Sequence, residues 1–382
     1  MNKSIPENSA ENSQSEVSEQ ASSYSEESAE LDSSATTSAA NQDSRMNEKE
    51  QKSAEQTKAT EQNNLQKFSH HGFYGFDTVT RIIGYEESEE AFNERVNWIS
   101  ERLLAYHDLF TSFDKVEGLL NIYEINQRAA KERLKTDEDI YNLLDFSLQM
   151  AEESEGSFNP CIGTVSSLWR EAMEKANAHP DEAALPDATD LAEAAKHISY
   201  ESLKLYPESR ELSFEDALMQ LDVGAIAKGY ALELVEREME KEGVSHYTIS
   251  LGGNVKALGA KPSGEPWKIG IQDPFDSAEI LGALSIEHKS VVTSGVYERF
   301  FMLDGERFHH IIDPETLYPS KYYASVTIIV EDSGIADALS TALFNMDREA
   351  GESLARKYGA DVIWVTNDGE VFKSKDFPYN ID

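Results

Sequence analysis

The stretch LDVGAIAKGY (Leu221–Tyr230) joins an apolar run to ALELVEREMEKEG, a segment with the composition of a helix. Asp222 closes the apolar run, Gly224 relaxes the backbone, and Lys228 lies about one turn into the expected helix. A helix N-terminus presents unpaired N–H groups and a partial positive charge, which suits an anion. The stretch is therefore either an ordinary capped junction with a solvated lysine or a place that holds an anionic ligand.

Length and charge limit the classes of function. The 382 residues suffice for one large domain or two modest ones with a substantial core. The formal net charge of -37 repels nucleic acid and anionic lipid surfaces, and no basic stripe with interleaved aromatic residues is present. We therefore set nucleic acid aside, and an anionic ligand would need local cations or a metal ion.

Cysteine and hydropathy patterns give further limits. Cys161 is the single cysteine, which excludes an internal disulfide framework and a cysteine-based zinc site, and we expect it to be a small buried side chain. No window approaches the 18 apolar residues of a transmembrane helix, and the N-terminus lacks an apolar signal core. The protein is then either cytosolic or a secreted protein whose signal is absent from this sequence.

Residues 1–66 are rich in Ser, Glu, Gln, Asn, Ala and Thr, with almost no large apolar side chains. Such a segment cannot bury enough surface to offset its ordering entropy, so we predict a disordered acidic leader over 1–66 and a folded catalytic domain over 67–382. A tether of this kind gives reach to a protein held at a cell surface.

The rest of the chain alternates helical and strand-like patterns. A strand is expected within 73–85, a helix over 88–113, and a second helix over 136–156 with Thr136 as its N-cap and Gly156 as its stop. Strands follow near 267–273, 281–287, 323–332 and 360–369, and one long helix is expected over 334–359. Long helices between hairpin-like runs predict an α+β fold, with helices packed on mainly antiparallel sheets.

Three further stretches carry candidate chemistry. In ISLGGNVKALG (Ile249–Gly259), the two adjacent glycines form either a plain hairpin turn or a place where a ligand approaches the backbone. In SGVYERFFMLDGERFHHIIDP (Ser294–Pro314), LDGE predicts a hairpin turn, and strand alternation lets only one of His309 and His310 face a given site. Histidine is the natural general base near neutral pH, although a structural role is as common.

Asp337 and Thr341 lie four residues apart, so their oxygens share one helix face. A carboxylate, a hydroxyl and backbone carbonyls make a hard-oxygen site suited to magnesium, provided that phosphate oxygens complete the coordination. The alternative is a polar stripe on an amphipathic helix.

Taken together, these stretches resemble the ApbE family of FAD:protein FMN transferases. The resemblance rests on GSFNPCIG, LDVGAIAKGYA, LGGNVKALG, PWKIGIQDP, TSGVYERFF, HHIIDPETLYP and SVTIIVEDSGIADALSTALF, in the family's order, from about Phe73 to Lys375. It implies an enzyme that binds FAD and Mg²⁺ and transfers the FMN moiety to a Thr or Ser hydroxyl of a target protein. The products would be a phosphodiester-linked flavin and AMP.

The resemblance also implies roles for individual residues. Asp337 and Thr341 would bind magnesium with their side chains and Ala225 with its backbone oxygen, while His310 would act as the general base. Positions matching FAD contacts are Asp222, Lys228, Ser157, Phe158 and Asn159, with Phe76 near the flavin and Asn121, Tyr123, Gly252, Gly253, Asn254 and Ser294 as further pocket residues.

Three positions depart from the family pattern: Asn159 stands where an aspartate is commoner, Phe76 replaces a methionine, and Leu317 occupies a position that is usually glycine. The alternatives to transfer are an FAD pyrophosphatase that uses water as acceptor and a non-catalytic flavin-binding protein. The intact His310, Asp337 and Thr341 argue against the second of these.

Family acceptors carry a motif close to Asp-Gly-x-Thr-Gly/Ser-Ala-Thr, and no such stretch occurs in this chain. The acceptor should therefore be a separate protein. The family's usual placement and the leader favour the extracellular face of the cell membrane, with a lipid anchor whose signal segment is absent from this sequence. A cytoplasmic location stays open.

Overall fold

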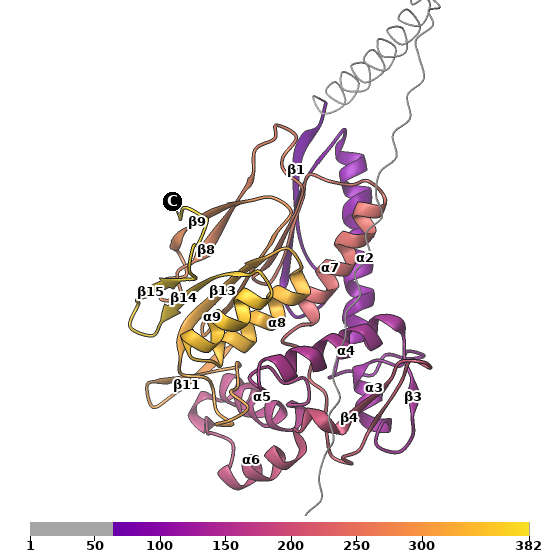
Figure 1. Ribbon diagram of the computed structural model, residues 1–382, viewed down its shortest axis with the longest axis vertical. Coiled ribbons are helices and arrows are strands. Elements are labelled where there is room, and N and C mark those ends of the chain that lie inside the picture. Colours follow the sequence, from indigo (N-terminus) through magenta and orange to yellow (C-terminus); the bar gives the residue numbers. More distant parts are fainter. Residues whose placement is uncertain (1–63, 382) are drawn as a thin grey trace, which may run out of the picture. The chain divides into compact units, whose positions relative to one another are not determined.

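The structure is a computed structural model that describes residues 64–381 (Figure 1). Apart from residues 64–66, the predicted leader lies outside the described residues. The first strand, β1, spans Gln66–Phe73, so regular structure begins before the strand expected within 73–85. The segment QKFSHHGF lacks a clean apolar alternation because β1 is an edge strand with largely exposed side chains.

An eight-stranded sheet forms the centre of the fold, and every pairing between its strands is antiparallel. In spatial order its strands are β1, β2 (Val79–Glu86), β6 (Tyr247–Leu251), β7 (Asn254–Leu258), β10 (Ser290–Gly295), β13 (Tyr323–Val330), β14 (Asp361–Thr366) and β15 (Val371–Lys373). The α+β prediction with mainly antiparallel sheets is confirmed.

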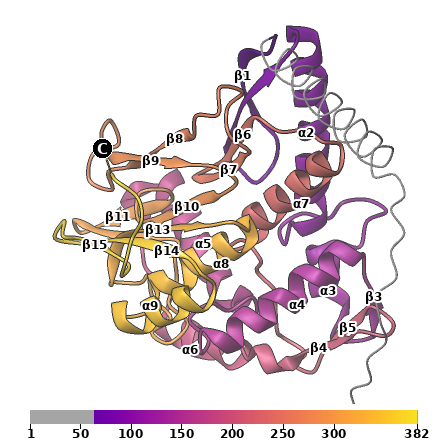
Figure 2. The ribbon, with the colours of Figure 1, turned by 45° about the horizontal axis from the view of Figure 1, so that its top comes forward.

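Helices cover one face of this sheet and a hairpin covers the other (Figure 2). The α-helices of residues 64–381 are α2 (Glu89–Phe110), α3 (Ile122–Arg128), α4 (Glu138–Glu153), α5 (Gly163–Ala178), α6 (Ala188–Ala194), α7 (Ala227–Lys241), α8 (Ser333–Phe344) and α9 (Arg348–Lys357). Ile82 and Val292 face the core shared with α2, α7, α8 and α9. Val291 and Ile329 point the opposite way and pack on Trp267 of the hairpin formed by β8 (Trp267–Gln272) and β9 (Ile280–Ile286).

Two smaller sheets complete the fold. One has the order β3 (Leu134–Lys135), β5 (Glu211–Phe214) and β4 (Leu203–Tyr206), and the other is the hairpin of β11 (Phe300–Leu303) and β12 (Glu306–His309). Phe301 and Phe308 pack this hairpin against Trp169 of α5. Within residues 64–381, no helix combines the length and the apolar character needed to cross a membrane.

The predicted range of α2 and the predicted stop at Gly156 are confirmed, whereas the predicted N-cap of α4 is wrong. Helix α2 lies within the predicted range and is capped by Ser88, whose side chain accepts a hydrogen bond from the Ala91 amide. Helix α4 is capped by Asp137, so the prediction of Thr136 as cap is wrong; the buried Thr136 instead donates its amide to Arg210 O. Gly156 confirms the predicted stop, because it adopts a left-handed backbone with φ of 86°.

The single helix predicted over 334–359 is wrong as well, because it is two helices, α8 and α9. Asn345 ends α8, and Asp347 begins α9 by accepting hydrogen bonds from the amides of Glu349 and Ala350. Cys161 is buried as expected, and burial raises the pKa of its thiol to about 12.

Candidate active site

The junction at Leu221–Tyr230 is a tight turn followed by α7. Asp222 holds it closed: its Oδ1 accepts a hydrogen bond from the Gly224 amide at 3.0 Å, and its Oδ2 accepts one from the Ser166 hydroxyl at 2.6 Å. Ser166 lies on α5 and was not predicted. No sequence pattern links Ser166 to Asp222, because the two residues are 56 positions apart and only the fold brings α5 to this turn.

A single hydrogen bond changes the chemistry of this turn. The Gly229 amide, in the first turn of α7, is one of the amides that a helix N-terminus leaves without an intrahelical acceptor, and it donates to Asp337 Oδ2 at 2.9 Å. The Ala225 carbonyl precedes the N-cap residue Ile226, and it has no hydrogen-bond donor among residues 64–381. An open carbonyl oxygen thus lies at the N-terminus of α7, where sequence similarity predicted a metal ligand.

The close approach of α7 and α8 makes that bond possible. A Cβ on Gly229 would lie only 2.2 Å from Ser333 O and 2.5 Å from Asp337 Cβ, so only glycine fits without movement. Lys228, which is mostly buried, places its Nζ 3.6 Å from Asp337 Oδ2 and 3.4 Å from Gly224 O.

Thr341 follows Asp337 by one turn of α8, is half-buried, and has no hydrogen-bond partner for its hydroxyl within the described chain. Asp337, Thr341 and the Ala225 carbonyl are all hard oxygen donors, which fits magnesium. In residues 64–381 no group of three His, Cys, Asp or Glu side chains could hold a metal ion. A cation here would need further oxygens from a ligand such as a pyrophosphate.

The two neighbouring histidines differ sharply. His309 is buried, its Nε2 donates to Ser320 O at 2.9 Å, and its Nδ1 accepts from the Ile311 amide at 3.3 Å, so both ring nitrogens are engaged. Burial lowers the pKa of His309 to about 4. His309 is therefore structural, which leaves His310 as the histidine available for chemistry.

His310 keeps part of its surface open and directs Nδ1 at Arg299 O, 3.2 Å away. Strand β12 ends at His309, so the alternation of side-chain directions predicted for the two histidines stops there. The backbone of the following loop sets the orientation of the His310 ring. Desolvation of the ring lowers the pKa of His310 to about 3, and the nearby charges of Arg299, His309 and Lys228 act in the same direction. The ring is thus neutral near pH 7, with Nε2 free to accept a proton.

Two of the predicted pocket residues around 157–159 serve the interior instead. Phe158 is fully buried and its side chain packs in the main core. Asn159 donates from Nδ2 to Ile198 O at 2.8 Å and accepts from the Cys161 amide at 2.8 Å. A carboxylate could not donate to that carbonyl, which accounts for an amide at this position. Contacts from this loop would therefore come through Ser157 and the backbone.

Asn121 also has a structural role. It is fully buried, caps α3 by accepting from the Glu124 amide, and donates to Asp108 O and Asp114 O. Its place in the pocket stays a prediction. Tyr123, on α3, stays half-buried.

Phe76 lies in the turn between β1 and β2 with a left-handed backbone (φ 55°). Its ring packs edge-to-face with the ring of His107, and the two ring centroids are 5.4 Å apart. Leu317, where a glycine was expected, also adopts a left-handed backbone, with φ of 65°. Its carbonyl accepts the indole N–H of Trp169, so that turn is kept despite the strain.

The turn formed by Gly252 and Gly253 joins β6 to β7. Gly252 and Gly253 have φ of 52° and 88°, and a Cβ on Gly252 would clash with Thr78 at 2.2 Å, which accounts for both glycines. Asn254 is buried, and its Nδ2 has no partner within the described residues. Ser294 shares a hydrogen bond of 2.7 Å with Ser340, whose hydroxyl donates to Asp337 O.

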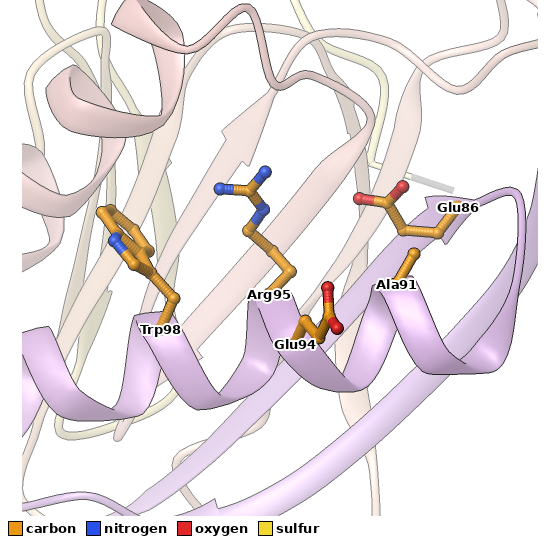
Figure 3. Close-up of a pocket in the computed structure, with 5 residues that line it drawn as sticks. All are labelled: Glu86, Ala91, Glu94, Arg95 and Trp98. Carbon is orange, nitrogen blue, oxygen red and sulfur yellow. The ribbon is translucent and has the colours of Figure 1, made fainter.

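Two surface hollows lie elsewhere. One, of about 300 Å³, lies beside α2 and is lined by Glu86, Ala91, Glu94, Arg95 and Trp98 (Figure 3). Arg95 there already pairs with Glu242 at 2.6 Å. The other, of about 350 Å³, is lined largely by polar and acidic side chains of α4 and residues 200–203. Neither includes a predicted site residue.

Comparisons with known proteins give one consistent answer. The profile of the ApbE family matches residues 76–364. The chain is 34% identical over 292 residues to an FAD:protein FMN transferase of Treponema pallidum, covering 70% of this chain and 78% of the relative. It is 32% identical over 289 residues to an FAD:protein FMN transferase of Klebsiella pneumoniae, covering 75% and 85%.

Solved structures agree. The ApbE protein of Thermotoga maritima superposes with a TM-score of 0.72 at 29% identity, covering 82% of this chain and 98% of that one. The apo flavinyl transferase ApbE of Pseudomonas stutzeri gives a TM-score of 0.68 at 24% identity, covering 81% and 95%, and supports the fold.

Proposed function

The chain belongs to the ApbE family of flavin transferases, and we propose that it transfers the FMN moiety of FAD to a Thr or Ser hydroxyl of an acceptor protein in a Mg²⁺-dependent reaction. The products are a phosphodiester-linked flavin and AMP. The observation that carries the metal-dependent form is the bond from the Gly229 amide to Asp337, which holds this carboxylate against the turn whose Ala225 carbonyl has no donor among residues 64–381.

The residues present fit a magnesium ion held by Ala225 O, Asp337 and Thr341. When bound, the cation would neutralise charge on the pyrophosphate of FAD and on the departing AMP. Lys228 adds a full positive charge at the same place, and the N-terminus of α7 adds a partial one. Together these groups offset the negative charge of the chain where a phosphate must bind.

His310 is the general base of the proposed transfer step. Its Nδ1–H is fixed on Arg299 O, so Nε2 can accept the proton of the acceptor hydroxyl. The acceptor oxygen forms a bond to the FMN phosphorus, the pyrophosphate P–O bond breaks, and AMP leaves with the electron pair. Bound phosphates would place negative charge beside the ring and raise the pKa of His310 toward the range useful for a base.

The remaining candidate residues would bind the flavin and ribityl part of FAD. Asp222, Ser157, Phe76, Tyr123, Gly252, Gly253, Asn254 and Ser294 remain our candidates for FAD binding, Ser157 and the glycines through their backbone. The unpartnered Nδ2 of the buried Asn254 is a donor that a bound ligand or a water could satisfy.

The test incubates the protein with FAD, Mg²⁺ and a separate acceptor domain carrying an Asp-Gly-x-Thr-Gly/Ser-Ala-Thr-like motif. The intact mass of the acceptor should rise by one FMN minus water, and chelation of the metal should abolish the rise. Consumption of FAD without a change in acceptor mass would establish the pyrophosphatase instead. FAD bound without turnover would leave a flavin-binding protein.

We also propose that the protein acts at the extracellular face of the cell membrane through an N-terminal lipid anchor. The support is compositional: the leader has the residues of a flexible tether. Fractionation of cells with an antibody to the folded domain tests it, and recovery of the protein in the cytosol alone would refute it.

A further inference from the structure

Asn345 lies at the end of the helix that carries the proposed metal ligands. Asp337, Thr341 and Asn345 follow one another at four-residue spacing, and Asn345 is the residue at which α8 stops. It is 6% exposed, so its amide is directed into the protein and not into solvent. The expectation of one continuous helix hid this residue, because a mid-helix asparagine would not have been assigned loop contacts.

The side-chain amide of Asn345 joins two loops of the site. Its Nδ2 donates to Ser157 O at 3.0 Å and to Ile312 O at 3.2 Å. Ser157 belongs to the loop proposed to contact FAD, and Ile312 lies two residues after His310. One NH₂ group therefore ties the flavin loop and the histidine loop to the helix of Asp337 and Thr341.

Both partners are carbonyl oxygens, so only a side chain with two N–H donors can satisfy them at once. Aspartate has the same shape but would direct negative oxygens at both carbonyls. The Oδ1 atom of Asn345 is buried with no donor among residues 64–381. An unpaired buried acceptor disfavours folding, so this asparagine is better explained by the geometry it imposes than by stability.

We infer that Asn345 is a positioning residue for flavin transfer: it fixes the His310 loop and the Ser157 loop relative to the helix that carries Asp337 and Thr341. The inference rests on the proposed function. It assigns Asn345 no contact with substrate, since its two hydrogens are used by the protein.

The first experiment compares Asn345→Asp with the wild type in the mass-shift assay. A displacement of about 1 Å of reacting groups can slow a reaction on the order of 100-fold, so kcat for transfer should fall by roughly 10- to 100-fold while KM for FAD changes much less. Asn367→Asp is the matched control, because its Nδ2 also donates to a distant backbone carbonyl, Lys321 O at 2.8 Å, on an exposed turn. That control should stay within about twofold of wild type.

Two further measurements separate positioning from general damage. Asn345→Gln keeps the amide donor and should retain more activity than Asn345→Asp at equal thermal stability; equal losses in the two variants would overturn the inference. In a double-mutant cycle with His310→Ala, the Asp substitution should add little to the loss caused by removing His310. Full additivity would show that Asn345 does not act through the histidine loop.

Assay of the wild type distinguishes failure of the positioning role from failure of the proposed function. Transfer by the wild type with an unchanged rate in Asn345→Asp would overturn the positioning role and leave the proposed function intact. Absence of transfer by the wild type would overturn the proposed function, and the positioning role with it.

Discussion

Gly229→Ala tests whether the close approach of α7 and α8 builds the metal site. The added Cβ would lie 2.2 Å from Ser333 O and 2.5 Å from Asp337 Cβ. Because ordinary contact between non-bonded heavy atoms needs about 3.5 Å, the two helices would have to separate by roughly 1 Å. That separation would pull Asp337 away from the Gly229 amide and from the turn that carries the Ala225 carbonyl.

The expected losses follow from that movement. Overpacking of a buried contact costs about 1–3 kcal/mol, and each kcal/mol lowers Tm by roughly 2–4 °C in a domain of this size. Transfer should slow on the order of 100-fold, because the three oxygens proposed to bind Mg²⁺ would be displaced relative to one another. The Mg²⁺ concentration for half-maximal activity should rise as well.

The assay is a Mg²⁺ titration of acceptor flavinylation, with thermal unfolding measured on the same samples. Gly351→Ala is the control: it is a buried helical glycine whose Cβ would meet Leu343 Cγ at 3.2 Å, part of a flexible side chain. Alanine there should be neutral or stabilising, since alanine favours a helix over glycine by about 1 kcal/mol. A Gly229→Ala protein with wild-type Tm and Mg²⁺ dependence would refute the reasoning.

Three other substitutions probe single groups. His310→Ala should lower transfer by about 10²- to 10⁴-fold while FAD binding, followed by flavin fluorescence, survives; retained transfer would remove His310 from the role of base. Asp337→Ala should reduce activity and Mg²⁺ dependence together, and unchanged activity with Mg²⁺ would show that the metal assignment is wrong. Lys228→Glu should weaken FAD binding well beyond the effect of an exposed charge reversal such as Lys321→Glu, and equal effects would mean that Lys228 does not face a phosphate.

The sequence was sufficient for the parts of this protein that local pattern controls. Periodicity predicted α2 and the antiparallel strands, LDGE predicted the turn between β11 and β12, and the ordered motifs indicated the family. The resemblance, and not geometry, distinguished His310 from His309 as the candidate base. The physical reason became visible only in the fold, where His309 uses both ring nitrogens internally.

What the sequence could not supply were contacts between distant segments. Nothing near Gly229 indicates that its amide bonds to a carboxylate 108 residues away, yet that bond holds Asp337 against the turn that carries the Ala225 carbonyl. The same holds for Asn345, which reaches a loop 188 residues earlier in the chain. Motif membership also does not report whether a side chain faces a pocket or the core, and the burial of Phe158 and Asn121 became visible only in the structure.

The charge arrangement at LDVGAIAKGY explains how a chain of net charge -37 can bind an anionic dinucleotide. In the free protein, Lys228 lies 3.6 Å from Asp337, so each partly neutralises the other. A divalent cation on Asp337 would take over that carboxylate and leave Lys228 to face a phosphate. A phosphate would in turn supply the oxygens that one carboxylate, one hydroxyl and one carbonyl cannot supply alone. Each ligand therefore improves the site for the other, and linkage requires the coupling to be equal in both directions.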